Sequence, residues 1–156
     1  MRFGKIFKDK KILITGHTGF KGTWLSLWLL KLGAGVYGIS DRVPTVPSNF
    51  KIISKNKNLK SKFIDIKNIK SIKKIIRDYK PDFIFHLAAQ ALVKKSYDNP
   101  EKTFLTNTIG TMNILEALRD YKKKCCVILI TSDKSYKNLE IKRGYKENDL
   151  LGGYDP

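Results

Sequence analysis

One short stretch, Gly16-His-Thr-Gly19-Phe-Lys-Gly22, constrains the fold more than any other part of the chain. It follows an apolar run at residues 11–15 and precedes residues 20–32, which are apolar nearly all round, as in a helix buried on a sheet. Glycines at this spacing allow a tight turn, close approach of the backbone to a pyrophosphate, and close packing of helix on strand. The N–H groups and positive dipole end of such a helix favour the same anion. The stretch therefore predicts a strand, a phosphate-binding turn and a helix in succession.

The rest of the chain continues this alternation of short strands and helices. Further strands are expected at 36–40, 61–66, 82–86 and 126–131, with helices at 49–55, 68–79 and 104–121. The last helix is expected to present one face made of Phe104, Asn107, Thr111, Ile114, Leu115, Leu118 and Tyr121. Repeated strand–helix–strand units imply an α/β fold: a Rossmann-like doubly wound parallel sheet with right-handed crossovers, truncated after about five strands.

Length and composition fit a single folded domain. The chain has 156 residues, of which 42% are hydrophobic, enough to bury a core. Its 31 Lys and Arg against 14 Asp and Glu give a net charge of +17, which first suggests a polyanionic partner. Only five of these basic residues are Arg, however, and proteins that read nucleic acid favour arginine forks with interleaved aromatic residues. We therefore interpret the lysines as a solvated coat and expect no nucleic-acid partner.

Several features exclude other classes of protein. No apolar stretch reaches the roughly 20 residues of a membrane span, and residues 1–11 lack the apolar region of a secretory signal. We expect a cytoplasmic protein without a membrane partner. Adjacent Cys125 and Cys126 would point to opposite faces of a strand, so they are interpreted as packing residues, with no disulfide and no metal site. Trp24 and Trp28 share one helix face and are expected in the core.

An acidic residue follows the second expected strand, as a dinucleotide site requires. Asp41 stands about 20 residues after the end of the turn, where a carboxylate would bond the adenosine ribose. The alternative is a plain turn residue at the end of a strand. Arg42 beside it could accept a 2′-phosphate, so NAD is preferred as cofactor and NADP stays open.

Together these motifs resemble the extended short-chain dehydrogenase/reductase family of NAD-dependent epimerases and dehydratases, and within it the CDP-glucose 4,6-dehydratase branch. Epimerases usually have a small residue and Ile in place of His17 and Lys21. The resemblance extends along nearly the whole chain from about Lys10. Further matching segments, in order, are Pro44-Thr-Val-Pro-Ser48, Asp65-Ile66, Phe85-His-Leu-Ala-Ala-Gln90, Thr106-Asn107 with Gly110-Thr111, Thr131-Ser-Asp-Lys134 and Gly152-Gly-Tyr-Asp-Pro156.

The resemblance implies NAD as cofactor and assigns residues to each part of it. They are Gly16, Gly19, Phe20, Lys21 and Gly22 at the pyrophosphate, Asp41 at the adenosine ribose, Asp65 and Ile66 about the adenine, Leu87, Ala88, Ala89 and Gln90 beside the nicotinamide half, and Thr106 as a further contact. Simple packing remains an alternative for Leu87 and the two alanines, and helix capping for Asp65. Neither His17 nor His86 is expected to be a catalyst.

The resemblance also implies a reaction, the conversion of CDP-glucose to CDP-4-keto-6-deoxyglucose by a lyase of nucleotide-sugar metabolism and deoxysugar biosynthesis. Hydride leaves C4 of the hexose, water is eliminated across C5 and C6, and the hydride returns to C6. Ser132 would hydrogen-bond the C4 oxygen and Asp133 would protonate the departing hydroxyl. Lys134 could be the C5 base if its pKa is lowered by burial or by nearby positive charge. The alternative is an ordinary polar turn.

The family's Tyr-x-x-x-Lys pair does not occur in the 156 residues. We therefore expect residues 1–156 to be an incomplete NAD-binding Rossmann domain, without the final strands and the sugar-nucleotide domain, and inactive alone. The resemblance implies a homo-oligomer for the full-length protein. Two alternatives stay open, another NAD-dependent sugar-nucleotide dehydratase or epimerase and a non-catalytic nucleotide-binding remnant.

Overall fold

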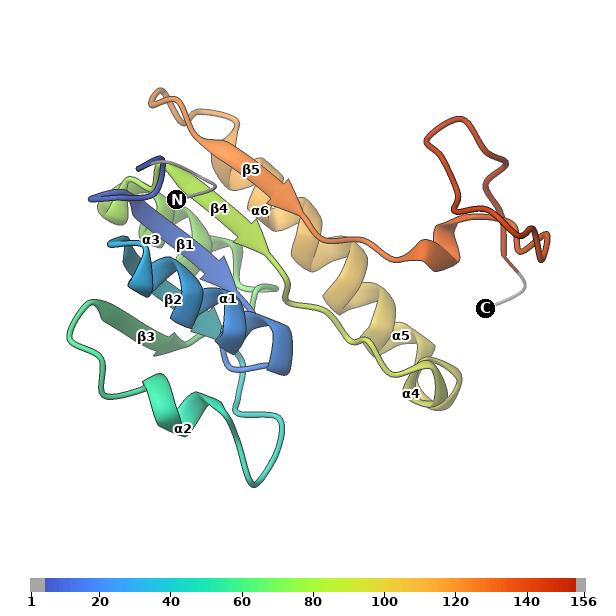
Figure 1. Ribbon diagram of the computed structural model, residues 1–156, viewed down its shortest axis with the longest axis horizontal. Helices are drawn as coiled ribbons and strands as arrows, with labels where there is room; N and C mark the ends of the chain where they lie inside the picture. The colour runs from blue at the N-terminus through green and yellow to red at the C-terminus, as the bar shows by residue number, and fades with distance from the viewer. Residues whose placement is uncertain (1–4, 154–156) are drawn as a thin grey trace.

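The computed structural model describes residues 5–153 and is built on a parallel five-stranded sheet (Figure 1). The strands stand in the order β3-β2-β1-β4-β5, so the winding direction reverses between β1 and β4. Their bounds are β1 (Lys11–Thr15), β2 (Gly35–Ser40), β3 (Leu59–Phe63), β4 (Phe83–His86) and β5 (Cys126–Leu129). This is the order of a doubly wound Rossmann-like sheet, which confirms the predicted fold class.

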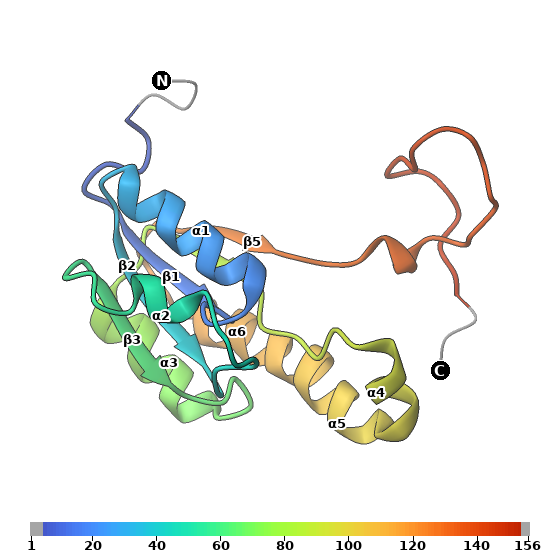
Figure 2. The ribbon, with the colours of Figure 1, turned by 60° about the horizontal axis from the view of Figure 1, so that its bottom comes forward.

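Helices cover both faces of the sheet (Figure 2). On one face lie α1 (Phe20–Lys31) and the short α2 (Phe50–Ile53), and on the other α3 (Ile69–Tyr79) and α6 (Gly110–Leu118). Alternate residues of β1 serve two separate cores, because side chains of a strand point to opposite faces. Ile12 and Ile14 pack under α1, whereas Leu13 packs on the α3 and α6 side.

The predicted amphipathic helix is confirmed as α3. It begins where the side chain of Asn68 accepts a hydrogen bond from the Ser71 N–H at 3.0 Å, and it ends at Lys80 in the left-handed conformation. The buried face consists of Ile72, Ile75 and Ile76, which meet α6. The helix is therefore held by a cap at its start and an isoleucine stripe along its length.

After β4 the chain forms α4 (Val93–Asp98), α5 (Pro100–Phe104), a π-helical turn (Leu105–Ile109) and α6. Residues 100–118 form one long helical run that extends beyond the edge of the sheet (Figure 1). The helix predicted at 104–121 thus begins earlier and ends earlier. Phe104 and Leu115, expected on the same face as buried Ile114, are exposed because the π-turn rotates the helix face at residues 105–109 and the packing stripe is narrower than predicted.

Beyond β5, residues 130–153 extend away from the sheet in both views (Figures 1 and 2). They contain a 3₁₀ turn, η2 (Asp133–Ser135), and a loop closed by a bridge between Tyr136 and Leu151. Inside the loop Arg143 bonds both carboxylate oxygens of Asp149 at 2.7 Å, which lowers the pKa of Asp149 to about 2. The loop is thus held by its own contacts.

The aromatic face of α1 does not lie where the sequence predicted. Trp24 and Trp28 are 55% and 49% exposed, and Phe20 is 72% exposed, so the core assignment of the tryptophans is wrong. The buried residues of α1 are mainly small or aliphatic, namely Gly22, Thr23, Ser26, Leu29 and Leu30. Small side chains let the helix axis approach the sheet closely, which leaves the bulky aromatic residues on the outer face.

Two further expectations are wrong. The third strand was predicted at 61–66, but β3 spans Leu59–Phe63, and Ile64, Asp65 and Ile66 form the connection to α3. Cys126, the first residue of β5, is exposed, so it is not a packing residue. Cys125 just before it is half-buried and packs against the core on the α3 and α6 side, as predicted. No helix within residues 5–153 is long and apolar enough to cross a membrane.

Candidate dinucleotide site

The Gly16–Gly22 turn lies at the carboxyl end of β1, where the strand order reverses. Gly16 has a φ of 75°, and a Cβ built there would stand 2.8 Å from the Ala88 nitrogen just beyond β4. A Cβ at Gly22 would overlap the carbonyl oxygen of Gly16. Both positions therefore require glycine. Because Gly16 has no side chain, the turn lies directly against the backbone of Leu87 and Ala88.

The start of helix α1 has no side-chain cap from the part of the chain that the structure describes. Gly19 at the N-cap position makes no side-chain hydrogen bond, and no acidic residue stands in the first turn. The first N–H groups of a helix have no partner within the helix, so here they remain open to an anion. Lys21 is exposed in the same turn and adds positive charge. By contrast, α3 is capped by Asn68.

A buried histidine ties the turn to two other strands. His17 is fully buried, with Nδ1 2.9 Å from Ser40 Oγ at the end of β2 and Nε2 2.7 Å from Ser61 Oγ in β3. Its ring lies over Gly38, where a Cβ would collide with it. Burial lowers the pKa of His17, so the ring stays neutral. This side chain positions the turn rather than facing a ligand.

Thr18 joins the turn to the segment that carries Asp41. Its hydroxyl donates to the carbonyl oxygen of Arg42 at 2.6 Å, and its N–H donates to Ser40 Oγ at 3.3 Å. Asp41 therefore lies beside the turn, with its carboxylate exposed and 3.8 Å from the Arg42 guanidinium. The arrangement places an accessible acid where an adenosine ribose would pass.

The predicted adenine contacts, Asp65 and Ile66, differ in exposure. Asp65 accepts the Lys67 N–H at 2.9 Å and pairs with the Lys67 ammonium at 3.4 Å, while its carboxylate stays accessible. It does not cap α3, since that position belongs to Asn68. Ile66 is buried against Gly110 of α6, where a Cβ would collide with it, and its carbonyl accepts from Asn113 at 3.0 Å.

The Leu87–Gln90 segment is fixed by polar side chains from outside it. Thr15 Oγ1 accepts the N–H groups of Leu87 and Ala88 at 3.2 and 3.1 Å. Asn107 bonds both the N–H and the carbonyl of Gln90, at 2.8 and 3.0 Å. The hydrogen bonds of Thr15 and Asn107 thus fix the backbone of this segment beside Gly16. Ala89, between the two bonded ends, is exposed.

The remaining predicted residues lie farther along the same edge. Thr106 is half-buried in the π-helical turn next to Asn107. Ser132, Asp133 and Lys134 follow the carboxyl end of β5 and are exposed. Ser132 Oγ accepts the Lys134 N–H at 3.3 Å and donates to Asp133 Oδ1 at 3.3 Å. Residues 5–153 therefore bring these three together with one another, but do not bury the Lys134 ammonium.

A family model described as GDP-mannose 4,6 dehydratase matches residues 13–154, which include every segment of the site just described. The chain belongs to this family. The last motif of the predicted resemblance, Gly152 to Pro156, lies partly outside the described residues, which end at 153.

Relatives within and around the family agree with this assignment. The chain is 45% identical over 150 residues to the CDP-glucose 4,6-dehydratase of Salmonella typhimurium, covering 96% of this chain and 42% of that protein. It is 36% identical to the CDP-paratose 2-epimerase of Salmonella typhi, covering 92% of this chain and 42% of that protein. The chain thus spans about 42% of the length of these curated relatives. The first match confirms the branch resemblance predicted from the glycine-rich turn.

A solved structure shows the same architecture. The UDP-glucose 4-epimerase of Thermus thermophilus, crystallised in complex with NAD, superposes with a TM-score of 0.79 at 26% identity, over 93% of this chain and 45% of that one. The Rossmann-like epimerase and dehydratase fold predicted from the sequence is therefore confirmed.

Sequence reasoning missed the interactions that position this site. They are the side-chain hydrogen bonds of Thr15, Thr18, Ser40, Ser61, Asn107 and Thr111, together with those of both histidines. A signal did exist for Thr15 and Ser40, which are polar residues at the ends of the apolar runs of β1 and β2. The partners in these hydrogen bonds lie 17 to 73 residues apart, however, so the spacing of residues in sequence could not pair them.

Proposed function

We propose that this chain carries the NAD-binding part of a nucleotide-sugar 4,6-dehydratase that acts on CDP-glucose. The observation that carries the proposal is the uncapped start of α1, placed by Gly16 and Gly22 at the point where the strand order reverses. The similarity to CDP-glucose 4,6-dehydratase supports the choice of substrate. The same similarity supports assignment to the lyases. A cytoplasmic location stays a prediction.

In this proposal the chain's own residues hold each part of the dinucleotide. Backbone N–H groups of Phe20, Lys21 and Gly22 receive the pyrophosphate, since they open the helix without a side-chain cap from residues 5–153. Asp41 accepts the adenosine ribose hydroxyls, and its pairing with Arg42 leaves the carboxylate accessible. Gly16 and Gly19 have no side chains, so the phosphates can approach the backbone of the turn closely.

The other cofactor contacts follow from the strand ends. Asp65 and Ile66 border the adenine, Leu87 to Gln90 line the ribose and nicotinamide half, and Thr106 approaches from the π-turn. Simple packing explains the burial of Ile66 equally, so its adenine role rests on the family resemblance. NAD, when bound, supplies the acceptor and later the donor of the hexose hydride.

The sugar chemistry is assigned to the segment after β5. Ser132 orients the C4 oxygen and Asp133 holds the proton given to the departing C6 hydroxyl, a pair whose side chains already bond each other at 3.3 Å. Lys134 is the C5 base, and it needs burial that residues 5–153 do not provide. Since the 156 residues contain no Tyr-x-x-x-Lys pair, we expect the chain alone to turn over no CDP-glucose.

Calorimetric titration with NAD tests the cofactor assignment. Asp41→Ala should weaken binding about tenfold, equivalent to about 1.4 kcal/mol, because the ribose loses a charged acceptor. The matched control is Asp98→Ala, which removes an acid on α4. Equal affinity of the wild type and Asp41→Ala would refute the ribose assignment, and tighter binding of NADP than of NAD would reverse the cofactor preference.

A turnover assay tests the reaction. The purified chain incubated with NAD and CDP-glucose should yield no 4-keto-6-deoxy product, whereas a chain extended to include a Tyr-x-x-x-Lys pair should yield it. Product from the 156-residue chain would show that the missing pair is not required. A product epimerised at C2 or C4 without loss of water, from the extended chain, would favour the epimerase alternative that the 36% identical CDP-paratose 2-epimerase represents.

A further inference from the structure

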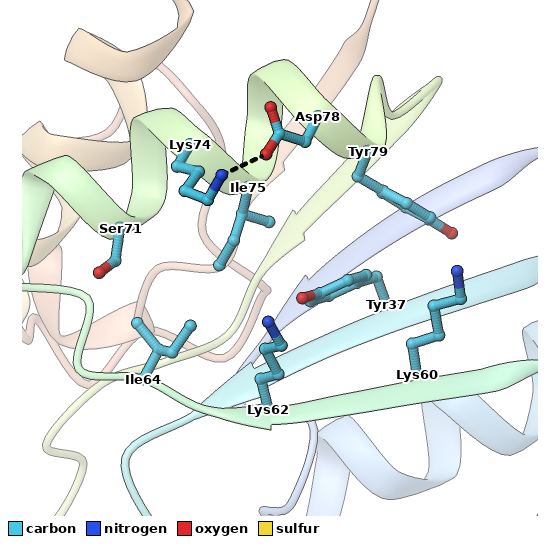
Figure 3. Close-up of a pocket in the computed structure, with 9 residues that line it drawn as sticks. All are labelled: Tyr37, Lys60, Lys62, Ile64, Ser71, Lys74, Ile75, Asp78 and Tyr79. Atoms are coloured by element: carbon cyan, nitrogen blue, oxygen red, sulfur yellow. Dashed lines mark hydrogen bonds and ion pairs between the residues drawn. The ribbon is translucent and has the colours of Figure 1, made fainter.

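A lysine-lined pocket lies between edge strand β3 and helix α3, on the sheet face opposite α1 (Figure 3). Its volume is about 360 Å³, near the lower end of the range for small-molecule sites. Lys60 and Lys62 of β3 both point into it, while Ser61 between them points to the other face and bonds His17. The proposed dinucleotide site does not use this pocket.

The pocket has an excess of positive charge. Three ammonium groups line it, from Lys60, Lys62 and Lys74, against one carboxylate, from Asp78. That carboxylate is already shared, since Lys74 bonds it at 3.0 Å and Arg77 at 3.1 Å, and these contacts lower the pKa of Asp78. Within residues 5–153, Lys60 and Lys62 pair with no carboxylate. The lining of the pocket therefore carries net positive charge, which an anion would offset.

The wall facing the lysines is rigid and offers a hydroxyl. The rings of Tyr37 and Tyr79 lie 5.1 Å apart at 54°, and the Tyr79 hydroxyl donates to the Gly35 carbonyl at 2.8 Å, which fixes both rings. The hydroxyl of Tyr37 has no partner among the described residues, and Figure 3 shows it directed to the side of the pocket where the Lys62 ammonium lies. Ser71 contributes a second hydroxyl from α3. These groups are donors suited to phosphate oxygens.

We propose that this pocket binds a small phosphate-bearing anion through Lys60, Lys62 and the Tyr37 hydroxyl. Lysine binds phosphate as a point charge and needs no bidentate geometry, so the long side chains of Lys60 and Lys62, which extend from the same face of β3, can both approach one anion. Lysines on an edge strand also prevent pairing with the strand of another sheet. That role alone would not explain why Lys74 of α3 and the rings of Tyr37 and Tyr79 line the same pocket. The bound anion would bridge β3 and α3 and so stabilise the segment between them, which contains Asp65.

Amide nuclear magnetic resonance of the 156-residue chain, titrated with sodium pyrophosphate at constant ionic strength, tests the proposal. Saturable shifts are expected at residues 59–64 and 71–79. Because pyrophosphate also fits the glycine-rich turn, three variants separate the sites. Lys60→Gln with Lys62→Gln should raise the dissociation constant measured at 59–64 about tenfold or more, whereas Lys21→Gln in the turn and Lys94→Gln with Lys95→Gln on α4 should change it less than about twofold.

A milder variant keeps the test independent of folding defects. Tyr37→Phe retains the ring and removes only the hydroxyl, so it should weaken pyrophosphate at 59–64 severalfold without changing the unbound spectrum elsewhere. The proposal is overturned if shifts concentrate at residues 16–22, if all charge variants lose affinity equally, or if no saturable shift occurs. A short DNA duplex that shifts lysines over the whole surface with the same affinity would likewise assign the binding to the general basic coat.

Discussion

The side chain of Asn107 binds both backbone polar groups of Gln90, accepting its N–H at 2.8 Å and donating to its carbonyl at 3.0 Å. Beyond the end of β4, the amide side chain of Asn107 thus makes the two hydrogen bonds that a neighbouring strand would otherwise make with this backbone. Asn107 itself stands in the π-helical turn, so an irregular helix and an irregular strand end hold each other. The pairing keeps the Leu87–Gln90 segment beside Gly16.

Asn107→Ala should lower the free energy of unfolding by about 1–3 kcal/mol, because two backbone groups lose their partners. Urea titration followed by circular dichroism measures this. Asn107→Asp, which keeps the acceptor and loses the donor, should fall between the wild type and Asn107→Ala. Asn148→Ala, at an exposed loop position, is the control and should be neutral. A loss below about 0.5 kcal/mol for Asn107→Ala would show that the pairing is dispensable.

Gly16→Ala should abolish NAD binding and destabilise the fold by about 2 kcal/mol or more, on account of left-handed strain and a steric clash. The new Cβ would stand 2.8 Å from the Ala88 nitrogen, and neither backbone can retreat. Gly144→Ala places its Cβ in open space and serves as control. Thermal unfolding and NAD titration of both variants check the prediction, and a stable Gly16→Ala protein that binds NAD normally would contradict it.

The sequence predicted local features well and long-range pairings poorly. The turn from Gly16 to Gly22 could be found because its requirements lie within one short segment. The third strand was predicted at 61–66 instead of Leu59–Phe63 because its bounds are set by long-range pairing with β2, from Leu59 opposite Val36 to Phe63 opposite Ser40. The bonds of His17 to Ser40 and Ser61 span 23 and 44 residues, so no spacing rule could reveal them.

The outward aromatic face of α1 gives a direct test of packing. Trp24→Gln and Trp28→Gln should each change the free energy of unfolding by less than about 1 kcal/mol, because both side chains are about half exposed. Leu29→Ala, on the buried face of the same helix, should cost about 2–5 kcal/mol. Acrylamide should quench the fluorescence of both tryptophans efficiently. Losses for the tryptophan variants equal to that of Leu29→Ala would place them in a core.

A chain of hydrogen bonds fixes the protonation of His86, which is only 3% exposed. Thr15 Oγ1 accepts from Leu87 and Ala88, so its own hydrogen points to His86 Nδ1 at 2.7 Å. The neutral ring then carries its proton on Nε2, which donates to Thr111 Oγ1 at 2.9 Å. Thr111 in turn donates to the Asn107 carbonyl at 2.7 Å.

His86 should therefore make the fold sensitive to acid. Burial lowers its pKa to about 4, below the ordinary value of 6.5, so between these values the unfolded chain binds the proton more readily than the folded one. The contribution to stability is full above pH 6.5 and is lost as the pH falls towards 4, up to about 3 kcal/mol. Urea titrations at about pH 7 and about pH 5 should show a decline, and His86→Gln should reduce its size. The chain has two histidines, so proton resonances can follow each ring, and a pKa near 6.5 for His86 in the folded protein would rule this out.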